Sequence, residues 1–223
     1  MPPVVTLFDV DNTLMDSDRI VADLMRFMDA ELGRERRDDY WQIFEALRAE
    51  LGYADYLGAL QRYRALHPRD SHVLAVSQFL IDYPFANRLF PESLDAVEHA
   101  KAWGAVVILS DGDVVFQPRK IERSGLFDLV EHRILIYVHK ELELADVERR
   151  YPAEHYVMVD DKLWLLQAIK AYWGARVTTV WPRQGHYVTD ARVRTLPPPD
   201  VTLTRIGEML AWDLPSLVQA ADR

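Results

Sequence analysis

The chain has 223 residues, of which 49% are hydrophobic and 27% are charged, so it can form one large globular domain or a domain with a sizeable insert. Its 26 lysines and arginines face 35 aspartates and glutamates, and a net charge of −9 argues against nucleic acid or an anionic membrane as a partner. The absence of cysteine excludes disulfides, thiolate metal sites and cysteine nucleophiles. Apolar runs are too short to span a bilayer and no secretory signal is visible, so we expect a soluble, cytoplasmic protein.

Short apolar runs rich in β-branched residues predict the strands. They lie at Val4–Phe8, Ala105–Leu109, Ile134–Val138, Tyr156–Val159, Val177–Val180 and, more weakly, Val201–Leu203. Runs that are apolar on both faces are typical of strands buried in a parallel sheet. Amphipathic stretches between them predict helices at Ser93–Trp103, Val114–Arg123, Glu141–Arg150 and Leu163–Trp173. This alternation predicts an α/β fold with a doubly wound parallel sheet.

One long connection interrupts the alternation. Between residues 14 and 88 there is no strand pattern, and helical periodicity instead covers Arg19–Leu32, Asp39–Leu51, Tyr53–Leu66 and Ser71–Asp82. We therefore expect a core formed by residues 1–17 and 89–223 and an all-helical insert formed by residues 18–88. The insert is crowded with aromatic and basic residues, and at helical spacing most of its aromatic rings are expected to form its own core. The aromatic and basic residues that crowd the insert are Trp41, Phe44, Tyr53, Tyr56, Arg62, Tyr63 and Arg64.

Polar and charged residues follow four of the predicted strands. In chain order they are Asp9, Asp11 and Thr13, then Ser110, Asp111 and Gly112, then Lys140, and finally Asp160 and Asp161. The carboxyl ends of parallel strands meet at one edge of a sheet, where ligands bind. Taken singly, the acidic residues and Ser110-Asp111-Gly112 also fit turn residues or helix caps. Lys140 fits such a role less well, because a lysine at the start of a helix lies at the unfavourable end of the helix dipole. Their convergence on one edge is what favours a functional site.

This set of side chains suits phosphoryl transfer. Several carboxylates at one point repel one another unless a cation joins them, and oxygen ligands favour Mg²⁺. A serine hydroxyl and a lysine can donate to the phosphoryl oxygens, while a second carboxylic acid protonates the leaving oxygen and later activates water. Lys120 and Lys162 compete with Lys140 for the role of the lysine. We rank them lower because Lys120 lies inside a predicted helix and Lys162 can pair with the neighbouring acids.

The order and spacing of these motifs resemble the haloacid dehalogenase (HAD) superfamily, in its phosphatase branch. The resemblance rests on Asp-x-Asp-x-Thr after an apolar strand, a strand-end serine, a later lysine and an Asp-Asp pair. Further similarity lies in Phe90-Pro91 and in Gln117-x-x-Lys120 before Gly125. The resemblance implies a Rossmann-like core with a helical cap inserted between the first and second motifs.

The resemblance also implies a role for each position. Asp9 would be the nucleophile, Asp11 the general acid and base with its backbone carbonyl on Mg²⁺, and Thr13 would steady the first loop. The metal site would comprise Asp9, Asp11, Asp160 and Asp161. Alignment of the apolar strand favours Asp161 over Asp160 as the direct ligand, and the choice between them stays open. The phosphate would contact Thr13, Ser110, Asp111, Gly112 and Lys140.

Two positions depart from the family pattern. Glu141 follows the lysine where many relatives have proline, and Asp111 follows the serine where asparagine is commoner. Asp111 would therefore either face away from the phosphate or select a substrate with a positive group. His139 and His186 are minor candidates for the pocket.

The function that we expect is magnesium-dependent hydrolysis of a small phosphate monoester through an aspartyl phosphate. A phosphomutase would use the same residues, whereas a dehalogenase needs neither Asp11 nor a metal. A phospho-accepting receiver module has its motifs in a different order and has no cap, and a non-catalytic scaffold would not need every charged group. The identity of the ester and the oligomeric state stay open.

Overall fold

A computed structural model describes residues 4–221 of the chain. The strands are β1 (Val4–Phe8), β2 (Ala105–Asp111), β3 (Ile134–Tyr137), β4 (His155–Val159), β5 (Val177–Pro182) and β6 (Val201–Leu203). They form one sheet in the order β3-β2-β1-β4-β5-β6, and each neighbouring pair is parallel. The predicted doubly wound parallel sheet is therefore confirmed.

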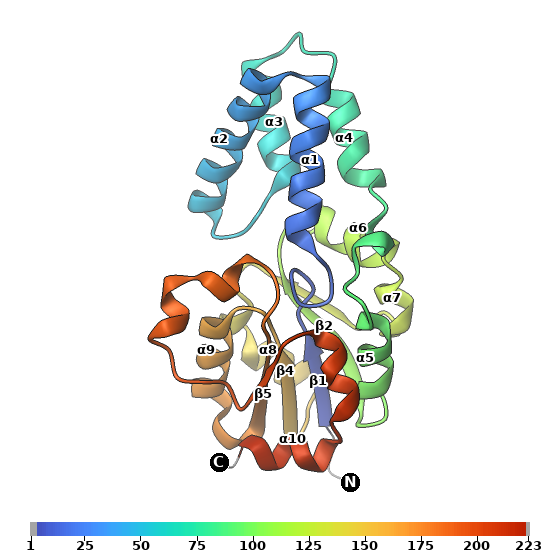
Figure 1. Cartoon of the computed structure of the whole chain (residues 1–223), viewed down its shortest axis with the longest axis vertical. Coiled ribbons are helices and arrows are strands. Elements are labelled where there is room, and N and C mark those ends of the chain that lie inside the picture. Colours follow the sequence, from blue (N-terminus) through green and yellow to red (C-terminus); the bar gives the residue numbers. More distant parts are fainter. Residues whose placement is uncertain (1–3, 222–223) are drawn as a thin grey trace.

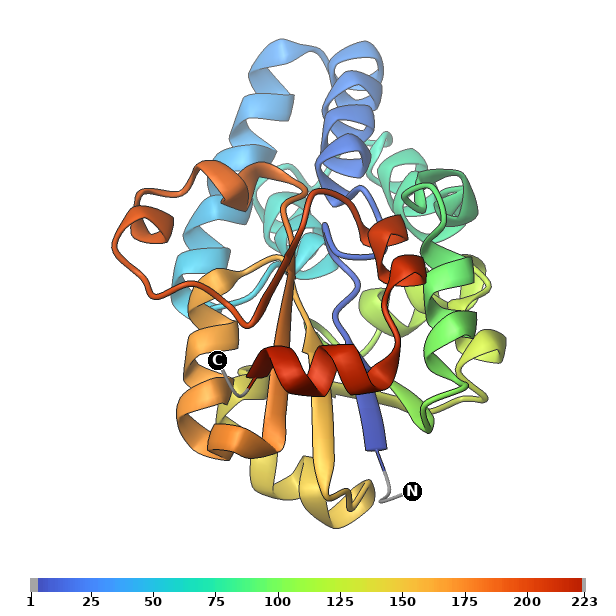
Figure 2. The same cartoon turned by 60° about the horizontal axis from the view of Figure 1, so that its bottom comes forward.

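Helices cover both faces of this sheet (Figure 1). The helices of the core are α5 (Ser93–Ala100), α6 (Phe116–Arg123), α7 (Leu126–Leu129), α8 (Leu144–Arg150), α9 (Leu163–Trp173) and α10 (Leu214–Ala221). Alternate residues of β1 enter different cores, because successive side chains of a strand point to opposite faces. Val4 and Phe8 join the core that contains α5, α6 and α10, whereas Val5 and Leu7 pack with α8 and α9. Figure 2 shows α10 crossing the sheet at the end where the strands begin.

The prediction of one helix over Glu141–Arg150 is wrong. A 3₁₀ turn covers Lys140–Leu142, and α8 begins only at Leu144. The break has a physical reason, because the side chain of Lys140 is completely buried beneath the end of the sheet while Leu142 is 73% exposed.

The insert between β1 and β2 consists of four helices, as expected. They are α1 (Ser17–Glu31), α2 (Arg34–Leu51), α3 (Tyr56–Leu66) and α4 (Val73–Asp82), and together they form a cap above the core (Figure 1). Both ends of the cap meet beside the sheet edge, since Asp16 N donates to Arg88 O at 2.7 Å and Phe90 N donates to Leu14 O at 2.9 Å. The boundary residues 18 and 88 stay a prediction.

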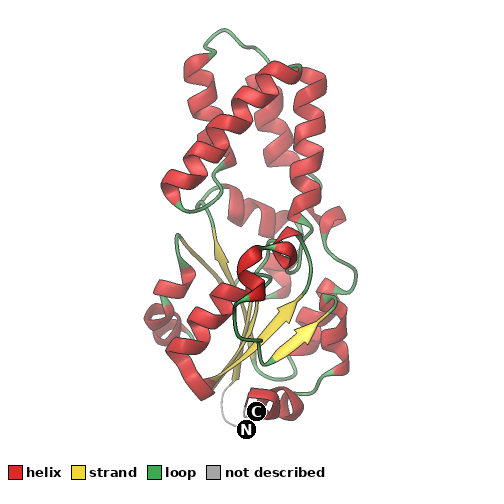
Figure 3. Cartoon of the chain, turned by 60° about the vertical axis from the view of Figure 1, so that its left-hand side comes forward, coloured by secondary structure: helices red, strands yellow, loops and turns green. Residues whose placement is uncertain are grey.

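Figure 3 shows the cap helices standing over the tips of the strands. No helix within residues 4–221 is both long enough and apolar enough to cross a membrane.

Candidate active site

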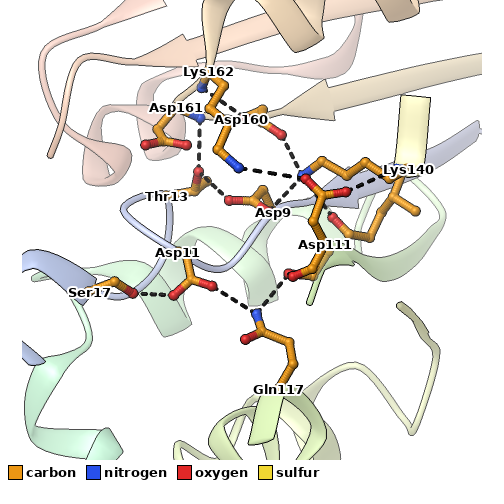
Figure 4. Close-up of polar contacts among 12 residues, drawn as sticks. Asp9, Asp11, Thr13, Ser17, Asp111, Gln117, Lys140, Asp160, Asp161 and Lys162 are labelled. Atoms are coloured by element: carbon orange, nitrogen blue, oxygen red, sulfur yellow. Dashed lines mark hydrogen bonds and ion pairs between the residues drawn. The ribbon is translucent and has the colours of Figure 1, made fainter. Parts of the chain in front are cut away.

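Asp9 follows β1 directly and lies at the centre of the sheet edge. Its backbone N–H donates to Val159 O at 3.0 Å, which continues the pairing of β1 with β4 beyond the last residue of the strand. Its side chain accepts a hydrogen bond from Thr13 Oγ1 at 3.2 Å and an ion pair from Lys140 Nζ at 2.6 Å (Figure 4). Burial raises the pKa of Asp9 to about 6, although the Lys140 charge opposes this shift.

Lys140 reaches the same point from the loop after β3. Its ammonium group is completely buried and lies 2.6 Å from both Asp9 Oδ1 and Asp160 Oδ2. Burial alone would lower its pKa, but the Asp160 and Asp9 carboxylates outweigh burial and raise that pKa well above the usual value. Lys140 is therefore a permanent cation beside the candidate nucleophile.

Three buried carboxylates gather at the ends of β1 and β4. Asp9, Asp160 and Asp161 each place an oxygen atom within 4.8 Å of the others. Asp160 has partners of its own, because Oδ1 accepts from Lys162 N at 2.8 Å and Oδ2 pairs with Lys140. Both oxygens of Asp161 are buried without a hydrogen-bond partner in the described part of the chain. Burial and the charges of Asp160 and Asp9 raise the pKa of Asp161 well above its usual range.

An unpartnered buried carboxylate is costly unless a cation binds it. Hard divalent cations such as Mg²⁺ prefer carboxylate oxygens as ligands. The residues of this cluster therefore fit a bound cation, and Asp161 is the member with the most uncommitted oxygens.

Asp11 lies apart from the three clustered carboxylates. It accepts hydrogen bonds from Ser17 Oγ and from Gln117 Nε2, the latter at 2.9 Å, and it pairs with Lys120 Nζ. Burial alone would raise its pKa, but the Lys120 charge and these hydrogen bonds lower that pKa to about 2. The Asp11 side chain is thus held as a carboxylate facing α6. The expectation that its backbone carbonyl binds Mg²⁺ stays a prediction.

Ser110 is connected to Asp11 through one side chain of α6. Gln117 Nε2 donates to Ser110 Oγ at 2.8 Å as well as to Asp11 Oδ2. From the sequence, Lys120 was named only as a lower-ranked rival of Lys140 and Gln117 only as part of the family resemblance, and Ser17 was not placed in the site. The spacing of three residues between Gln117 and Lys120 puts them on one face of a helix that follows β2, which is the signal that could have found them.

The carboxylate of Asp111 contacts two groups of the protein. Its Oδ1 accepts from Lys140 N at 2.9 Å, and its Oδ2 lies 3.6 Å from Lys162 Nζ (Figure 4). The two expectations for its departure from the family pattern stay predictions. Asp111 orients the backbone that carries Lys140.

Gly112 and Thr13 shape the backbone around these groups. Gly112 has a φ of +150°, and a Cβ there would lie 3.1 Å from Gln117 Cβ, so glycine allows α6 to approach. Thr13 Oγ1 accepts from Asp161 N at 3.0 Å while donating to Asp9, which ties the loop after β1 to the loop after β4. The structure thus brings the sequence-predicted residues to one edge, and their catalytic roles stay predictions.

A cavity of about 420 Å³ separates the cap from this edge. Asp11, Lys120 and Lys162 line it from the core, whereas Trp41 and Tyr56 line it from the cap. The expectation that most of the aromatic rings form the core of the insert is therefore incomplete, because several of them also line the cavity. Tyr63 is fully buried inside the insert. Phe44 and Tyr53 line the cavity together with Trp41 and Tyr56.

The two histidines that we singled out differ in their positions. His186 lines the cavity, whereas His139 packs against the cap. A Cβ at Gly52, which has a φ of +83°, would lie only 2.6 Å from His139 Cε1. The glycine therefore permits a close contact between α2 of the cap and the loop that carries Lys140.

Comparisons with known proteins agree with this arrangement. A family model described as haloacid dehalogenase-like hydrolase matches residues 5–172. A crystal structure of a haloacid dehalogenase-like hydrolase from Burkholderia xenovorans LB400 is 60% identical, with a TM-score of 0.90, and the match covers 96% of this chain and 100% of that one. No curated protein matches the sequence.

Two more distant structures share the fold. The L-2-haloacid dehalogenase from Xanthobacter autotrophicus is 20% identical with a TM-score of 0.61, and the match covers 98% of this chain and 99% of that one. The HAD hydrolase YfnB from Bacillus subtilis, in a form bound to magnesium, is 16% identical with a TM-score of 0.60. The match covers 95% of this chain and 98% of that one.

Proposed function

The chain belongs to the haloacid dehalogenase-like hydrolases, and from this premise we propose that it is a magnesium-dependent phosphatase acting on a small phosphate monoester. The observation that carries the proposal is the buried carboxylate of Asp161, which lies beside Asp9 and has no hydrogen-bond partner among the described residues. A bound cation would compensate the buried negative charge of this carboxylate. The same cation would reduce the repulsion between the Asp9 carboxylate and a phosphate dianion that approaches it.

In the proposed reaction, Asp9 attacks the phosphorus atom of the ester. The bond between phosphorus and the leaving oxygen breaks, and the phosphoryl group passes to an Asp9 carboxylate oxygen. Water then attacks the aspartyl phosphate and releases inorganic phosphate, which restores the carboxylate. The position of Asp9 supports this role, because Lys140 Nζ and Thr13 Oγ1 fix both of its oxygens.

Charge on the transferred group would be stabilised by donors of this chain. The Lys140 ammonium and the Ser110 hydroxyl lie at the same edge as Asp9, and Lys162 contributes a third donor from the loop after β4. Donors aimed at the equatorial oxygens stabilise a loose phosphoryl-transfer transition state more than the ground state. Asp9, Asp160 and Asp161 would hold Mg²⁺, which when bound neutralises charge on the phosphoryl oxygens.

Asp11 is the group that we propose moves the proton. As a carboxylate it can take a proton from the attacking water in the second step. In the first step, an ester that binds as its monoanion brings a proton on its phosphoryl group. Asp11 accepts this proton and passes it to the leaving oxygen. Gln117 and Lys120 hold the carboxylate in place between Ser110 and the cavity.

Of the two alternative enzymes, a dehalogenase fits fewer of these observations, whereas a phosphomutase fits the same ones. Dehalogenation has no use for a second acid held by two α6 side chains, nor for the unpaired oxygens of Asp161. A phosphomutase would use the same groups and differ only in passing the phosphoryl group to a second alcohol instead of water.

The test is turnover of the purified protein with a panel of phosphate esters and with a 2-haloalkanoic acid, each with Mg²⁺ and with excess chelator. We expect phosphate release that depends on Mg²⁺ and no halide release. Halide release in the presence of chelator would contradict the proposal. Isomeric phosphate products in place of free phosphate would identify a mutase.

A further inference from the structure

The cavity between cap and core has an aromatic wall that spans both parts of the molecule. Neighbouring ring centroids lie 4.8 Å apart for Trp41 and Phe44, 4.6 Å for Phe44 and Tyr56, and 5.4 Å for Tyr56 and Phe116. These rings come from α2, α3 and α6 and all line the cavity. Trp41, Phe44 and Tyr56 are stacked on one another, and Phe116 is tilted by 57° against Tyr56. Together these rings give one side of the cavity an apolar surface against which a bound ring can pack.

Arg48, on α2 of the cap, brings a positive charge to the wall of the cavity. Its Nη2 donates to Tyr187 Oη at 2.6 Å, which connects α2 to the loop after β5. Its nearest carboxylate, Glu45, is 3.9 Å away, is about half exposed and does not line the cavity. An exposed pair at this distance on a helix surface contributes little to holding a charge.

The other charged groups that line the cavity are already paired with protein. Lys120 pairs with Asp11, and Lys162 lies 3.6 Å from Asp111. Asp18 accepts hydrogen bonds from Asn12 Nδ2 at 3.0 Å and from His186 N at 2.8 Å. The carboxylates of the cavity are therefore occupied, whereas the guanidinium of Arg48 retains donors for an anion.

We propose that the cavity binds the leaving group of an ester that has a flat, apolar ring and a carboxylate, with the ring on the aromatic wall and the carboxylate on Arg48. This inference rests on the proposed phosphatase function, and it names the substrate class of that site. Arg48 is then a specificity-determining residue, because a planar guanidinium recognises a carboxylate through two parallel hydrogen bonds. Tyr187 orients the guanidinium for this contact.

The probes are two esters of nearly equal shape, para-carboxyphenyl phosphate and para-carbamoylphenyl phosphate. Only the first has a negative charge on its ring. We expect the wild-type protein to show a kcat/KM about tenfold higher for the carboxylate, mostly through KM, because a charge-assisted hydrogen bond is replaced by a neutral one. Arg48→Met should reduce the ratio of the two kcat/KM values to about one, and Arg48→Lys should retain part of it.

Arg62→Met is the matched control. Arg62 also lies in the cap, but it pairs with Glu50 at 2.8 Å and does not line the cavity. Its substitution should leave the wild-type ratio unchanged. Equal kcat/KM values for the two esters in the wild-type protein, or a ratio that Arg48→Met does not change, would overturn the assignment.

Calorimetric binding of both esters to Asp9→Asn, with and without Arg48→Met, separates this inference from the proposed function. The preference for the carboxylate should appear there in the dissociation constant and disappear with Arg48→Met. If the wild-type protein hydrolyses neither ester but this preference in binding persists, the phosphatase proposal fails and the carboxylate site stands. If binding shows no dependence on Arg48, the carboxylate site fails whatever the turnover.

Discussion

The ammonium group of Lys140 lies 2.6 Å from the carboxylate of Asp9, although the two residues belong to strand ends separated by β2 in the sheet. The same ammonium lies 2.6 Å from Asp160, so one buried cation contacts two members of a cluster of three carboxylates. Lys140 can neutralise only one of these negative charges. The two negative charges that remain are the physical reason for a cation or a proton at Asp161.

Loss of this lysine should destabilise the fold as well as the activity. Lys140→Met leaves the Asp9 and Asp160 carboxylates buried without their shared cation, so we expect the free energy of unfolding to fall by about 3 kcal/mol. Urea denaturation monitored by circular dichroism measures this change. Lys101→Met removes the exposed Lys101–Glu98 pair at 2.8 Å and should cost less than about 0.5 kcal/mol. Equal effects of the two substitutions would show that the buried pair is not a structural element.

The unpartnered oxygens of Asp161 predict that Mg²⁺ stabilises the folded protein by binding to this residue. In the wild-type protein, Mg²⁺ at 100 times its dissociation constant should add about 2.7 kcal/mol to the free energy of unfolding. Asp161→Asn should remove most of this gain, while the metal-free protein keeps its stability or gains slightly because a buried charge is lost. Thermal melts with Mg²⁺ and with chelator measure both effects. Asp128→Asn, at an exposed site on α7, should respond to Mg²⁺ as the wild type does. An undiminished response of Asp161→Asn would move the metal to other ligands.

Ser110 is expected to act on the transition state rather than on folding. Ser110→Ala removes a buried hydroxyl donor at the edge of the sheet, so we expect kcat/KM for an aryl phosphate to fall by a factor that corresponds to about 2–4 kcal/mol. Ser124→Ala is the comparison, because Ser124 is also buried but donates to Ile121 O at 2.8 Å within α6. Steady-state kinetics of the two variants distinguish the roles. A loss of the same size in Ser124→Ala would mean that the effect comes from disturbed packing.

Much of the sheet could be predicted because its signals are local. The apolar runs gave the bounds of β1 and β6 as the structure has them, and the amphipathic pattern gave those of α9. Parallel strands place their carboxyl ends together, so the residues after the strands identified the site edge before any contact was known. The helical nature of the insert was equally evident from its periodicity.

The parts that could not be predicted depend on contacts distant in the sequence. The turn at Lys140 replaces helix because the buried side chain is held by Asp9 and Asp160, which lie on other strands. The spacing of Gln117 and Lys120 places them on one face of α6, but their contacts with Asp11 depend on how α6 packs against the loop after β1. The aromatic rings of α2 and α3 face a cavity only because the cap sits over the core, and helical periodicity alone cannot distinguish such a wall from an internal core.

A carboxylate inside the cap provides a pH-dependent test of stability. Asp70 accepts from Tyr63 Oη at 2.7 Å and from His72 N at 3.0 Å, and Arg36 lies 3.0 Å away. Burial raises the pKa of Asp70, but the hydrogen bonds and the Arg36 charge outweigh burial and lower it from 3.8 to about 2. Because the folded pKa lies below the unfolded one, Asp70 stabilises the fold above about pH 4, and this contribution is lost as the pH falls towards 2.

Asp70→Asn should therefore lower the free energy of unfolding by about 1–2 kcal/mol at neutral pH, with the difference shrinking between pH 4 and pH 2. Denaturation of both proteins across this range measures the difference. Asp39→Asn, which alters a partly exposed pair with His67, should cost less than about 0.5 kcal/mol at neutral pH. A difference for Asp70→Asn that grows on acidification would contradict the assigned pKa.

The proposed reaction requires that Asp9 becomes phosphorylated during turnover. An aryl phosphate mixed with the wild-type protein and Mg²⁺, quenched in acid within one turnover and analysed by mass spectrometry, should show one phosphoryl group on the peptide that contains Asp9. Asp11→Asn should still form this adduct with the activated ester, since an aryl leaving group needs little protonation. Asp9→Asn should form none and release no phosphate, although its fold persists because Lys140 retains Asp160 as a partner. Phosphate release by Asp9→Asn at the wild-type rate, with no phosphoprotein in either protein at any quench time, would show that the reaction does not pass through Asp9.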